Sequence, residues 1–393
     1  MKRCHSFIFK FLNFYIVSAA VLLTLSGCIE EYEADITSED SDILVVEGTI
    51  CSSQLNQFIL SRSQPVNYSD TPLMVTGARV SVRGSDGSEW MTQETDGYYS
   101  CRIDALDPNV NYYLHIETDG EVYESEPQKP IRTEEIENVS VVQETPKSNI
   151  DILVTPEVPF DPDKANYYSW TYDETWEVHP EYRSIMYYDT QKMEPVIDTH
   201  LYPERGWKDA RGSTIMVGAS QNYEGRHIQR LKLYDIDRSD SRIYFRYSGL
   251  VHQRAISKEE YEYVLARRQA GFEMGGLFTP LPSALPTNIH CLTSKRHVIG
   301  FVGCALNTSE YRFFLNTEDY SVLRPVEKDT RLWYEDPTAM QCIQLVKERD
   351  LFLCDWYTTM STVGTPIVHS AWAYEYQLDV RLTGAYIEIP DFW

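Results

Sequence analysis

From Asp42 onward, apolar and polar residues alternate in short runs, as they do in half-buried β-strands. Turn residues such as Gly84 and Asp86 separate neighbouring runs at the spacing typical of a β-sandwich. About seven strands are expected before Pro127, over residues 43–50, 57–63, 78–83, 90–93, 97–103, 112–118 and 122–125. The pattern therefore predicts a first domain, a β-sandwich, over residues 42–133.

The chain stays β-rich after residue 133, and the pattern predicts a second, larger domain over residues 134–393. Its longest run, residues 166–178, places Tyr168, Trp170 and Trp176 on one side of a strand, so a buried aromatic face is expected. Further strands are expected over residues 149–158, 184–188, 214–217, 228–236, 243–256, 297–302, 310–316, 341–346 and 372–382.

One segment carries a helical period. Ser257 followed by Glu260 forms a capping box, which predicts a helix over residues 258–270 that ends at Gly271. Glycines and prolines then exclude regular structure from a loop over residues 271–289. The fold prediction is mainly β: a transthyretin- or immunoglobulin-like β-sandwich, followed by a larger β-rich domain with one helix.

Four side chains are candidates for contact with a ligand or a partner. Phe278 and Leu281 lie among the prolines of the loop, where rigid apolar groups lose little entropy on binding. For this pair, the alternative is that they cover the protein's own core. Trp207 and Tyr223 lie in polar, glycine-containing surroundings, so we expect them to be exposed and able to stack on a glycan or a peptide.

Residues 1–27 have the pattern of a secretory signal peptide, because Lys2 and Arg3 precede an apolar run over residues 11–25. That run has 15 residues, whereas a membrane-spanning helix needs about 20. The sequence LSGC, which ends at Cys28, is similar to the processing site of bacterial lipoproteins, where the cysteine becomes the lipid-bearing N-terminus. We predict lipidation of Cys28; the alternative is an ordinary cleaved signal followed by an incidental cysteine.

Residues 28–41 are predicted to form an acidic tether between the lipid and the first domain. Glu30, Glu31 and Glu33 follow the cysteine closely. In lipoproteins of Bacteroidota, such a cluster resembles the signal for export to the outer leaflet of the outer membrane. The alternative is a solvated tether without an export role. The expected location is the outer membrane, with the protein lipid-anchored and facing the cell exterior.

The formal net charge of −24 argues against one class of partner. A strongly negative surface repels phosphate backbones, so nucleic acid is not expected to bind. The same charge suits an extracellular protein and is compatible with cationic ligands.

Six cysteines remain beyond the signal peptide and Cys28, an even number for an oxidising compartment. Proximity in the sequence favours three disulfides, and free buried thiols are the alternative. The favoured pairs are Cys51 with Cys101, Cys291 with Cys304, and Cys342 with Cys354.

No motif predicts catalysis, since the sequence contains neither Gly-x-Ser-x-Gly nor His-Glu-x-x-His. Residues 235–241 have the alternating oxygen side chains of a calcium loop, but Arg246 stands at the twelfth position, where a glutamate is required. A polar turn is expected there. Asp173 and Glu174 are adjacent on a strand and should point to opposite faces. We therefore expect no enzyme activity, no metal and no cofactor.

Five stretches together resemble one family. They are YYSWTYDETWEV, YFRYSGLVHQRAISKEEYEYV, GGLFTPLPSALPTNI, HVIGFVGC and the terminal PDFW. In this order they are similar to the Bacteroidota lipoproteins grouped as domain-of-unknown-function family 4249, over residues 42–320 and the last four residues. The first domain also resembles transthyretin-like and carboxypeptidase-regulatory-like modules. Family members resemble outer-membrane lipoproteins, often encoded beside TonB-dependent transporters of the starch-utilisation type, with no established reaction.

The resemblance implies a surface-exposed outer-membrane lipoprotein that acts without catalysis, as an accessory or binding subunit of a TonB-dependent nutrient transporter. Its expected partners are the outer membrane, the transporter, and a glycan or peptide ligand. Two alternatives stay open: a structural or envelope-assembly lipoprotein that binds proteins, and a hydrolase of glycans or peptides.

Overall fold

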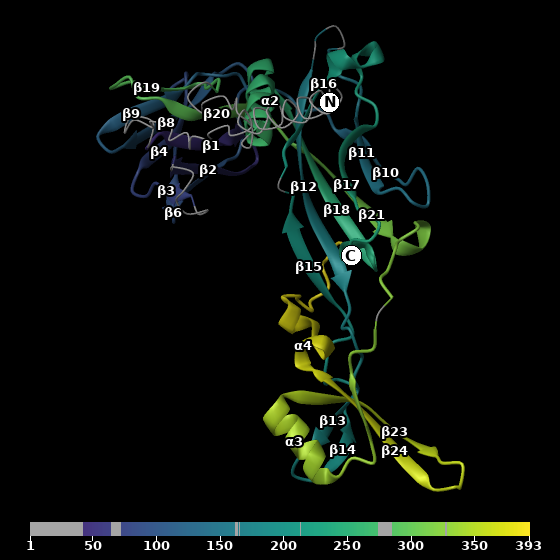
Figure 1. Ribbon diagram of the computed structural model, residues 1–393. Helices are drawn as coiled ribbons and strands as arrows, with labels where there is room; N and C mark the ends of the chain where they lie inside the picture. The colour runs from purple at the N-terminus through teal and green to yellow at the C-terminus, as the bar shows by residue number, and fades with distance from the viewer. Residues whose placement is uncertain are drawn as a thin grey trace, which may run out of the picture.

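The computed structural model describes residues 42–63, 72–161, 164, 166–212, 214–273, 285–326 and 328–393. Strands form most of the regular structure, which confirms the mainly β prediction. Figure 1 shows three parts along the molecule: an N-terminal sandwich, a central pair of sheets, and a lower lobe around helix α3 (Ala339–Arg349). None of the described helices is both long and apolar enough to cross a membrane.

The N-terminal sandwich consists of two facing sheets. Its strands are β1 Leu44–Cys51, β2 Gln54–Arg62, β3 Leu73–Met74, β4 Arg79–Gly84, β5 Glu89–Met91, β6 Gln93–Thr95, β7 Tyr98–Ile103, β8 Tyr112–Thr118, β9 Glu121–Ser125, β19 Ile289–Cys291 and β20 Val298–Ala305. One sheet has the order β20-β1-β2-β7-β6, with β3 on β2, and the other has the order β19-β9-β8-β4-β5. Because strand residues alternate between faces, Phe58 and Leu60 of β2 share one core with Val80 and Val82 of β4.

The sandwich predicted over residues 42–133 is incomplete without a later part of the chain. β20 pairs in parallel with β1, from Leu44 beside Val298 to Cys51 beside Ala305, and β19 pairs with β9. The chain leaves the sandwich near the predicted boundary at residue 133, but the sandwich also takes two strands from residues 289–305 that the prediction gave to the second domain. β20 is buried along nearly its whole length, as parallel strands commonly are. Such a continuous apolar run predicts a strand, but its sequence does not indicate which sheet it joins.

The central part packs two sheets against each other. One has the order β10-β11-β17, and the other has the order β15-β12-β18-β21, with β16 on β12. The bounds are β10 Ile136–Val142, β11 Ile150–Pro156, β12 Tyr167–Val178, β15 Gly206–Arg211, β16 Met216–Ala219, β17 Leu231–Ile236, β18 Arg246–Ile256 and β21 Ser309–Asn316. β12 confirms the strand predicted over residues 166–178, and Tyr168 and Trp170 are buried in the core between the sheets.

Helix α2 (Lys258–Glu273) begins where the capping box predicted, but it continues past Gly271. The Ser257 Oγ accepts a hydrogen bond from the Glu260 N–H at 3.1 Å. On the buried side of the helix, Val264 packs in one cluster with Phe301 of β20. α2 therefore lies at the junction of the N-terminal sandwich and the central sheets (Figure 1).

The lower lobe contains a three-stranded sheet, a hairpin and two helices. Its elements are β13 Met186–Asp189, β14 Glu194–Ile197, β22 Leu332–Glu335, α3, β23 Leu351–Met360, β24 Pro366–Tyr374 and α4 Glu375–Leu378. The sheet order is β22-β24-β23, and β13 pairs with β14. Tyr188, Leu345, Leu353 and Trp372 form its core.

Two strand predictions in this lobe are wrong. Residues 341–346 belong to helix α3, which begins after the N-cap residue Thr338. The apolar residues of this helix pack into the lobe's core. The strand predicted over residues 372–382 ends at Tyr374, where α4 begins, and the 3₁₀ helix η6 (Val380–Thr383) follows. The expectation of a single helix therefore fails as well.

Candidate functional site

The outer face of the β15-β12-β18-β21 sheet carries a row of polar and charged side chains that crosses all four strands. Arg211 donates from Nε to Asp173 at 3.2 Å. The ring of His252 lies between two carboxylates, with Nε2 2.9 Å from Asp173 and Nδ1 3.0 Å from Glu310. Exposed ion pairs stabilise a fold by at most about 1 kcal/mol each. Their main effect is to hold an arginine, a histidine and two carboxylates in fixed positions on this face.

Glu174, the next residue along β12, points into the opposite side of the sheet and is only 4% exposed. Its two carboxylate oxygens accept from Arg242 Nη1 at 2.7 and 2.8 Å, and the Tyr247 hydroxyl donates to it at 2.7 Å. Burial, together with the neighbouring Tyr234 and Glu174, raises the pKa of Tyr247 well above its ordinary value. The prediction that Asp173 and Glu174 face opposite ways is confirmed.

Residues 390–393 cover one end of the same outer face. The Trp393 ring meets Trp207 at 6.2 Å and Phe314 at 6.1 Å, both in edge-on geometry. The Arg246 guanidinium lies over both Phe314 (4.4 Å) and Trp393 (5.1 Å). Each arginine–aromatic contact contributes about 0.5–2 kcal/mol, depending on how far it is removed from water. The terminal aromatics are therefore docked on the central sheet.

A second arginine fixes the neighbouring ring of this segment. The Arg312 guanidinium lies 3.5 Å from the centre of the Phe392 ring, and its Nη1 donates to the Ser248 Oγ at 3.0 Å. Burial lowers the pKa of Arg312, and the carboxylates of Asp173 and Glu310 counteract part of that effect. Sequence reasoning missed both arginines; a signal for them was the concentration of aromatic residues in the final PDFW.

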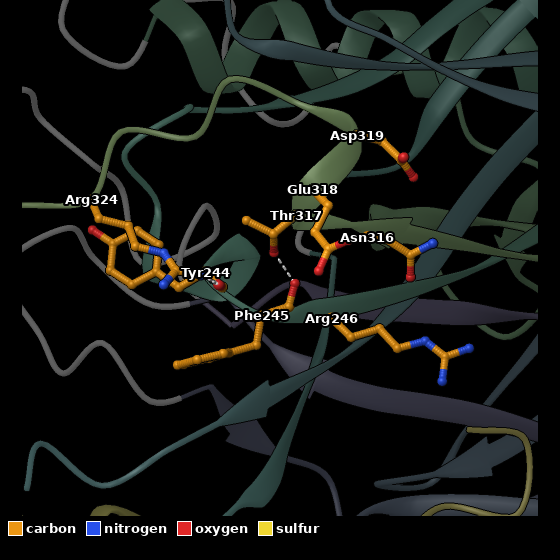
Figure 2. A pocket seen from close by; sticks show the side chains of 8 residues that line it. All are labelled: Tyr244, Phe245, Arg246, Asn316, Thr317, Glu318, Asp319 and Arg324. Carbon is orange, nitrogen blue, oxygen red and sulfur yellow. Dashed lines mark hydrogen bonds between the residues drawn. The ribbon is translucent and has the colours of Figure 1, made fainter.

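Two clefts flank the docked aromatics. One has a volume of about 480 Å³, and its walls include Asp173, Asp209, Arg211, Arg312 and Phe392. The other, of about 450 Å³, is shown in Figure 2 and is lined by Tyr244, Phe245, Arg246, Asn316, Thr317, Glu318, Asp319 and Arg324. Both clefts mix acidic and arginine side chains, whereas pockets that hold small molecules are mostly apolar.

Backbone contacts hold the second cleft together. The Thr317 hydroxyl donates to the Ile243 carbonyl at 2.8 Å and also to that of Phe245, the contact drawn in Figure 2. Arg324 donates to the Tyr244 carbonyl, and its guanidinium lies 5.2 Å from the centre of the Phe245 ring. Thr317 thereby ties the end of β21 to the turn before β18. Among the described residues, no group of three or more His, Cys, Asp or Glu side chains is placed to hold a metal ion.

The structure corrects the expectation for Trp207. Its side chain is 1% exposed, because Trp393 covers the ring and the backbone of Tyr386 pairs with that of Trp207 through hydrogen bonds of 2.8 and 3.0 Å. Tyr223 lies between the 3₁₀ helices η1 (Ser220–Asn222) and η2 (Glu224–Arg226), and is half-buried against the central core. Neither ring stands free on the surface as predicted.

The remaining predicted contact and lipidation residues lie outside the described residues. These are Phe278 and Leu281 in the loop, and Cys28 at the start of the tether.

All six described cysteines are free thiols. Cys101 of β7 is the register partner of Asn56 on β2, and Asn56 hydrogen-bonds both backbone groups of Cys51. Neighbouring strands lie about 4.8 Å apart, so two cysteines with a strand between them exceed the roughly 7 Å Cα separation that a disulfide tolerates. The predicted pair Cys51–Cys101 is therefore wrong.

The structure forms neither of the two other predicted pairs, because Cys291, Cys304, Cys342 and Cys354 are all free thiols. Cys291 lies in β19 and Cys304 in β20, and both face the core of the sandwich. Cys342 of α3 and Cys354 of β23 are buried in separate core clusters. Proximity in sequence is a poor guide here, because strand direction and burial decide which side each thiol faces.

Comparison with known proteins gives one clear result. Among curated proteins, none matches the chain. The family described as Domain of unknown function (DUF4249) matches residues 29–311, which is most of the chain and includes the N-terminal sandwich, α2 and the central sheets up to the start of β21. The order of the resembling stretches and this match agree, so the chain belongs to the DUF4249 family.

Proposed function

We propose that the chain is a lipid-anchored outer-membrane lipoprotein, exposed at the cell surface, that acts without catalysis as an accessory or binding subunit of a TonB-dependent nutrient transporter. One observation supports the proposed lipid anchor. The family match begins at residue 29, directly after Cys28, the residue predicted to bear the lipid. The proposed processing site and the family region therefore adjoin without an intervening residue.

The shape of the described chain supports a role in reaching a partner. The N-terminal sandwich begins at Leu44, soon after the predicted tether, so it is the part nearest in sequence to the proposed lipid anchor. The central sheets and the lower lobe extend from it toward the opposite end of the molecule (Figure 1). The transporter is proposed as the partner because of the family resemblance, since such lipoproteins are often encoded beside one.

The outer face of the central sheet supports binding in preference to hydrolysis. A glycosidase needs two carboxyl groups about 5–9.5 Å apart across one cleft. Asp173 and Glu174 point to opposite sides of the sheet, and each is held in an ion pair with an arginine. Asp209 shares a cleft with Asp173, but its carboxylate accepts hydrogen bonds from the hydroxyls of Thr175 and Tyr386. We propose that the two clefts contribute to ligand or partner contact.

The anchor is tested by metabolic labelling with a palmitate analogue. Wild-type protein should be labelled, and Cys28→Ser protein should lose the label and leave the membrane fraction. Protease added to intact cells should degrade the wild-type protein. Protection from protease would contradict surface exposure, and equal labelling of both proteins would contradict lipidation at Cys28.

The partner is tested by affinity purification of the tagged protein from gently solubilised outer membrane. We expect a TonB-dependent transporter in near-equal amount. Recovery of the lipoprotein alone, with its lipid intact, would contradict the accessory-subunit role. Turnover on panels of glycans or peptides by the purified protein would contradict the non-catalytic role.

A further inference from the structure

The β23–β24 hairpin contains a segment without charge in a highly charged protein. The thirteen residues from Trp356 to Val368 include no Asp, Glu, Lys or Arg, whereas these four types make up 24% of the chain. At that average, about three charged residues would be expected in the segment. The hairpin projects from the lower lobe, at the end of the molecule opposite the N-terminal sandwich (Figure 1).

Large apolar side chains on this hairpin face solvent. Tyr357 is 42% exposed, Met360 69% and Val363 83%. On the neighbouring strand β22, Trp333 is also exposed, and its ring meets that of Tyr357 edge-on at 6.1 Å. Exposed apolar groups gathered in this way mark interaction surfaces. Interface cores are likewise depleted of charge and enriched in Tyr, Trp and Met.

The tip of the hairpin is held in one conformation. The Ser361 N–H donates to the Thr365 carbonyl at 2.8 Å, the Thr365 N–H to the Ser361 Oγ at 2.9 Å, and the Gly364 N–H to the Ser361 carbonyl at 3.0 Å. Gly364 has a φ of 82°, which a residue with a side chain rarely adopts. A preformed tip loses little entropy when it binds.

The two edges of the hairpin differ. On the β24 side, Asp336 closes the edge: its N–H donates to the Val368 carbonyl, and its carboxylate accepts from the Val368 N–H, both at 2.8 Å. On the other side, β23 pairs with β24 alone among the described strands. An open strand edge invites pairing with another chain, and proteins usually protect such edges with charges. From Trp356 to Met360 this edge has none.

These observations indicate which class of molecule would bind the hairpin. A lipid surface is disfavoured, because the proposed anchor joins the opposite end of the molecule. A second copy is disfavoured, because two bodies of net charge −24 repel each other. A sugar stacks on a flat aromatic surface, whereas the planes of Trp333 and Tyr357 are 70° apart. An extended segment of a different polypeptide can form backbone hydrogen bonds along the open edge of β23 and cover the exposed apolar side chains.

We infer that the β23–β24 hairpin is a docking element for a different protein, which adds an uncharged, extended segment along the edge of β23. The identity of that protein as the transporter and the exclusion of a lipid surface rest on the proposed function. The hairpin's open edge and its exposed apolar side chains are independent of it.

The inference is tested in living cells that make the full-length protein. A photo-crosslinking amino acid, benzoylphenylalanine, replaces Thr358 or Thr362 on the hairpin, and Glu144 of the central part serves as the control position; all three are exposed. We expect one protein adduct of the same mass from both hairpin positions and none from Glu144. Adding Met360→Lys should reduce the adduct at least tenfold, because the new charge must be desolvated. Adding Leu55→Lys, on the exposed face of β2, should leave it unchanged.

The identity of the adduct tests the docking inference and the proposed function separately. An adduct that contains a TonB-dependent transporter supports both the inference and the proposed function. An adduct that contains another envelope protein, and is lost with Met360→Lys, supports the hairpin but contradicts the proposed partner. A dimer of the chain, a glycan adduct, no adduct, or an adduct insensitive to Met360→Lys overturns the inference. If affinity purification then still recovers the transporter, the proposed function survives without it.

Discussion

Glu260 forms a largely buried ion pair with Arg254 of β18, next to the N-terminal sandwich. Its carboxylate accepts hydrogen bonds from Arg254 Nη1, at 3.0 Å, and Nη2, and its side chain is 8% exposed. Gly303 of β20 lies against the pair, since an added Cβ there would stand 2.3 Å from Glu260 Oε2. The capping box is thus only half formed: the carboxylate turns to Arg254, because a buried guanidinium needs a partner more than an N-cap N–H does.

Replacing Glu260 with alanine should destabilise the protein strongly. The change leaves the Arg254 guanidinium buried without a partner, which costs about 3–5 kcal/mol. Urea unfolding followed by tryptophan fluorescence measures this cost. Glu262→Ala on the same helix is the control, because Glu262 makes only an exposed ion pair with Lys258 at 3.4 Å, and it should change the free energy of unfolding by less than about 0.5 kcal/mol. Equal effects of the two changes would contradict the role of the pair.

The six thiols should differ sharply in reactivity. Burial acts to raise the pKa of Cys291, but hydrogen bonds with Ser294 and Thr293 outweigh it, and the net shift is downward. Burial raises the pKa of Cys101 to about 11 and that of Cys304 to about 12. Because the thiolate is the reactive form, iodoacetamide at pH 8 should label Cys291 first. Peptide mass spectrometry over time checks this order, and equally fast labelling of Cys101 or Cys304 would refute it.

Helix α3 shows how one element can be misjudged from its sequence. Cys342, Ile343, Leu345 and Val346 suggest a strand, because β-branched and apolar residues favour strands. The capping box of Thr338 and Gln341 decides otherwise, and Asp350 ends the helix in a left-handed conformation. Cys342 and Leu345 then share the face that packs into the core of the lower lobe.

Thr338→Ala should loosen α3 without unfolding the molecule. Loss of an N-cap side chain costs about 1 kcal/mol, which corresponds to roughly fivefold faster hydrogen exchange of amides in the helix. Exchange of a peptide covering residues 339–349, read by mass spectrometry, measures the effect. Thr338→Asp keeps the cap and should exchange like wild type, as should a peptide from α2 in both variants. Unchanged exchange in Thr338→Ala would show that packing alone holds the helix.

At the scale of the whole molecule, the chain leaves the N-terminal sandwich, builds every strand of the central sheets except β21, and returns to complete the sandwich. Ile289, Val298, Val302 and Cys304 belong to the same core as Leu44 and Val46. Gly300 makes the return possible, since a Cβ there would lie 2.1 Å from the Val46 carbonyl oxygen. The chain therefore crosses between the two parts more than once, and the ion pair of Arg254 and Glu260 lies against Gly303 of β20 where they meet.

A fragment of residues 42–133 should not fold cooperatively, although its sequence pattern resembles a complete module. It lacks β19 and β20, so the edge of β1 and its apolar side chains are exposed to water. We expect no sharp transition in thermal unfolding followed by circular dichroism, and strong binding of a hydrophobic dye. The chain from residue 42 to 393 is the control and should show a cooperative transition. A cooperative transition in the fragment would contradict the shared core.

The sequence by itself determined the mainly β fold, the buried aromatic face of β12, the start of α2 and the opposite orientation of Asp173 and Glu174. These features depend on alternation, helical period and capping, which act between residues close in the chain. Only the tertiary structure decided the pairing of β20 with β1, the burial of Trp207 under Trp393, the partner of Glu260 and the open edge of β23. Each of these depends on which distant residues meet, because pairing and burial are set by contacts between segments far apart in sequence.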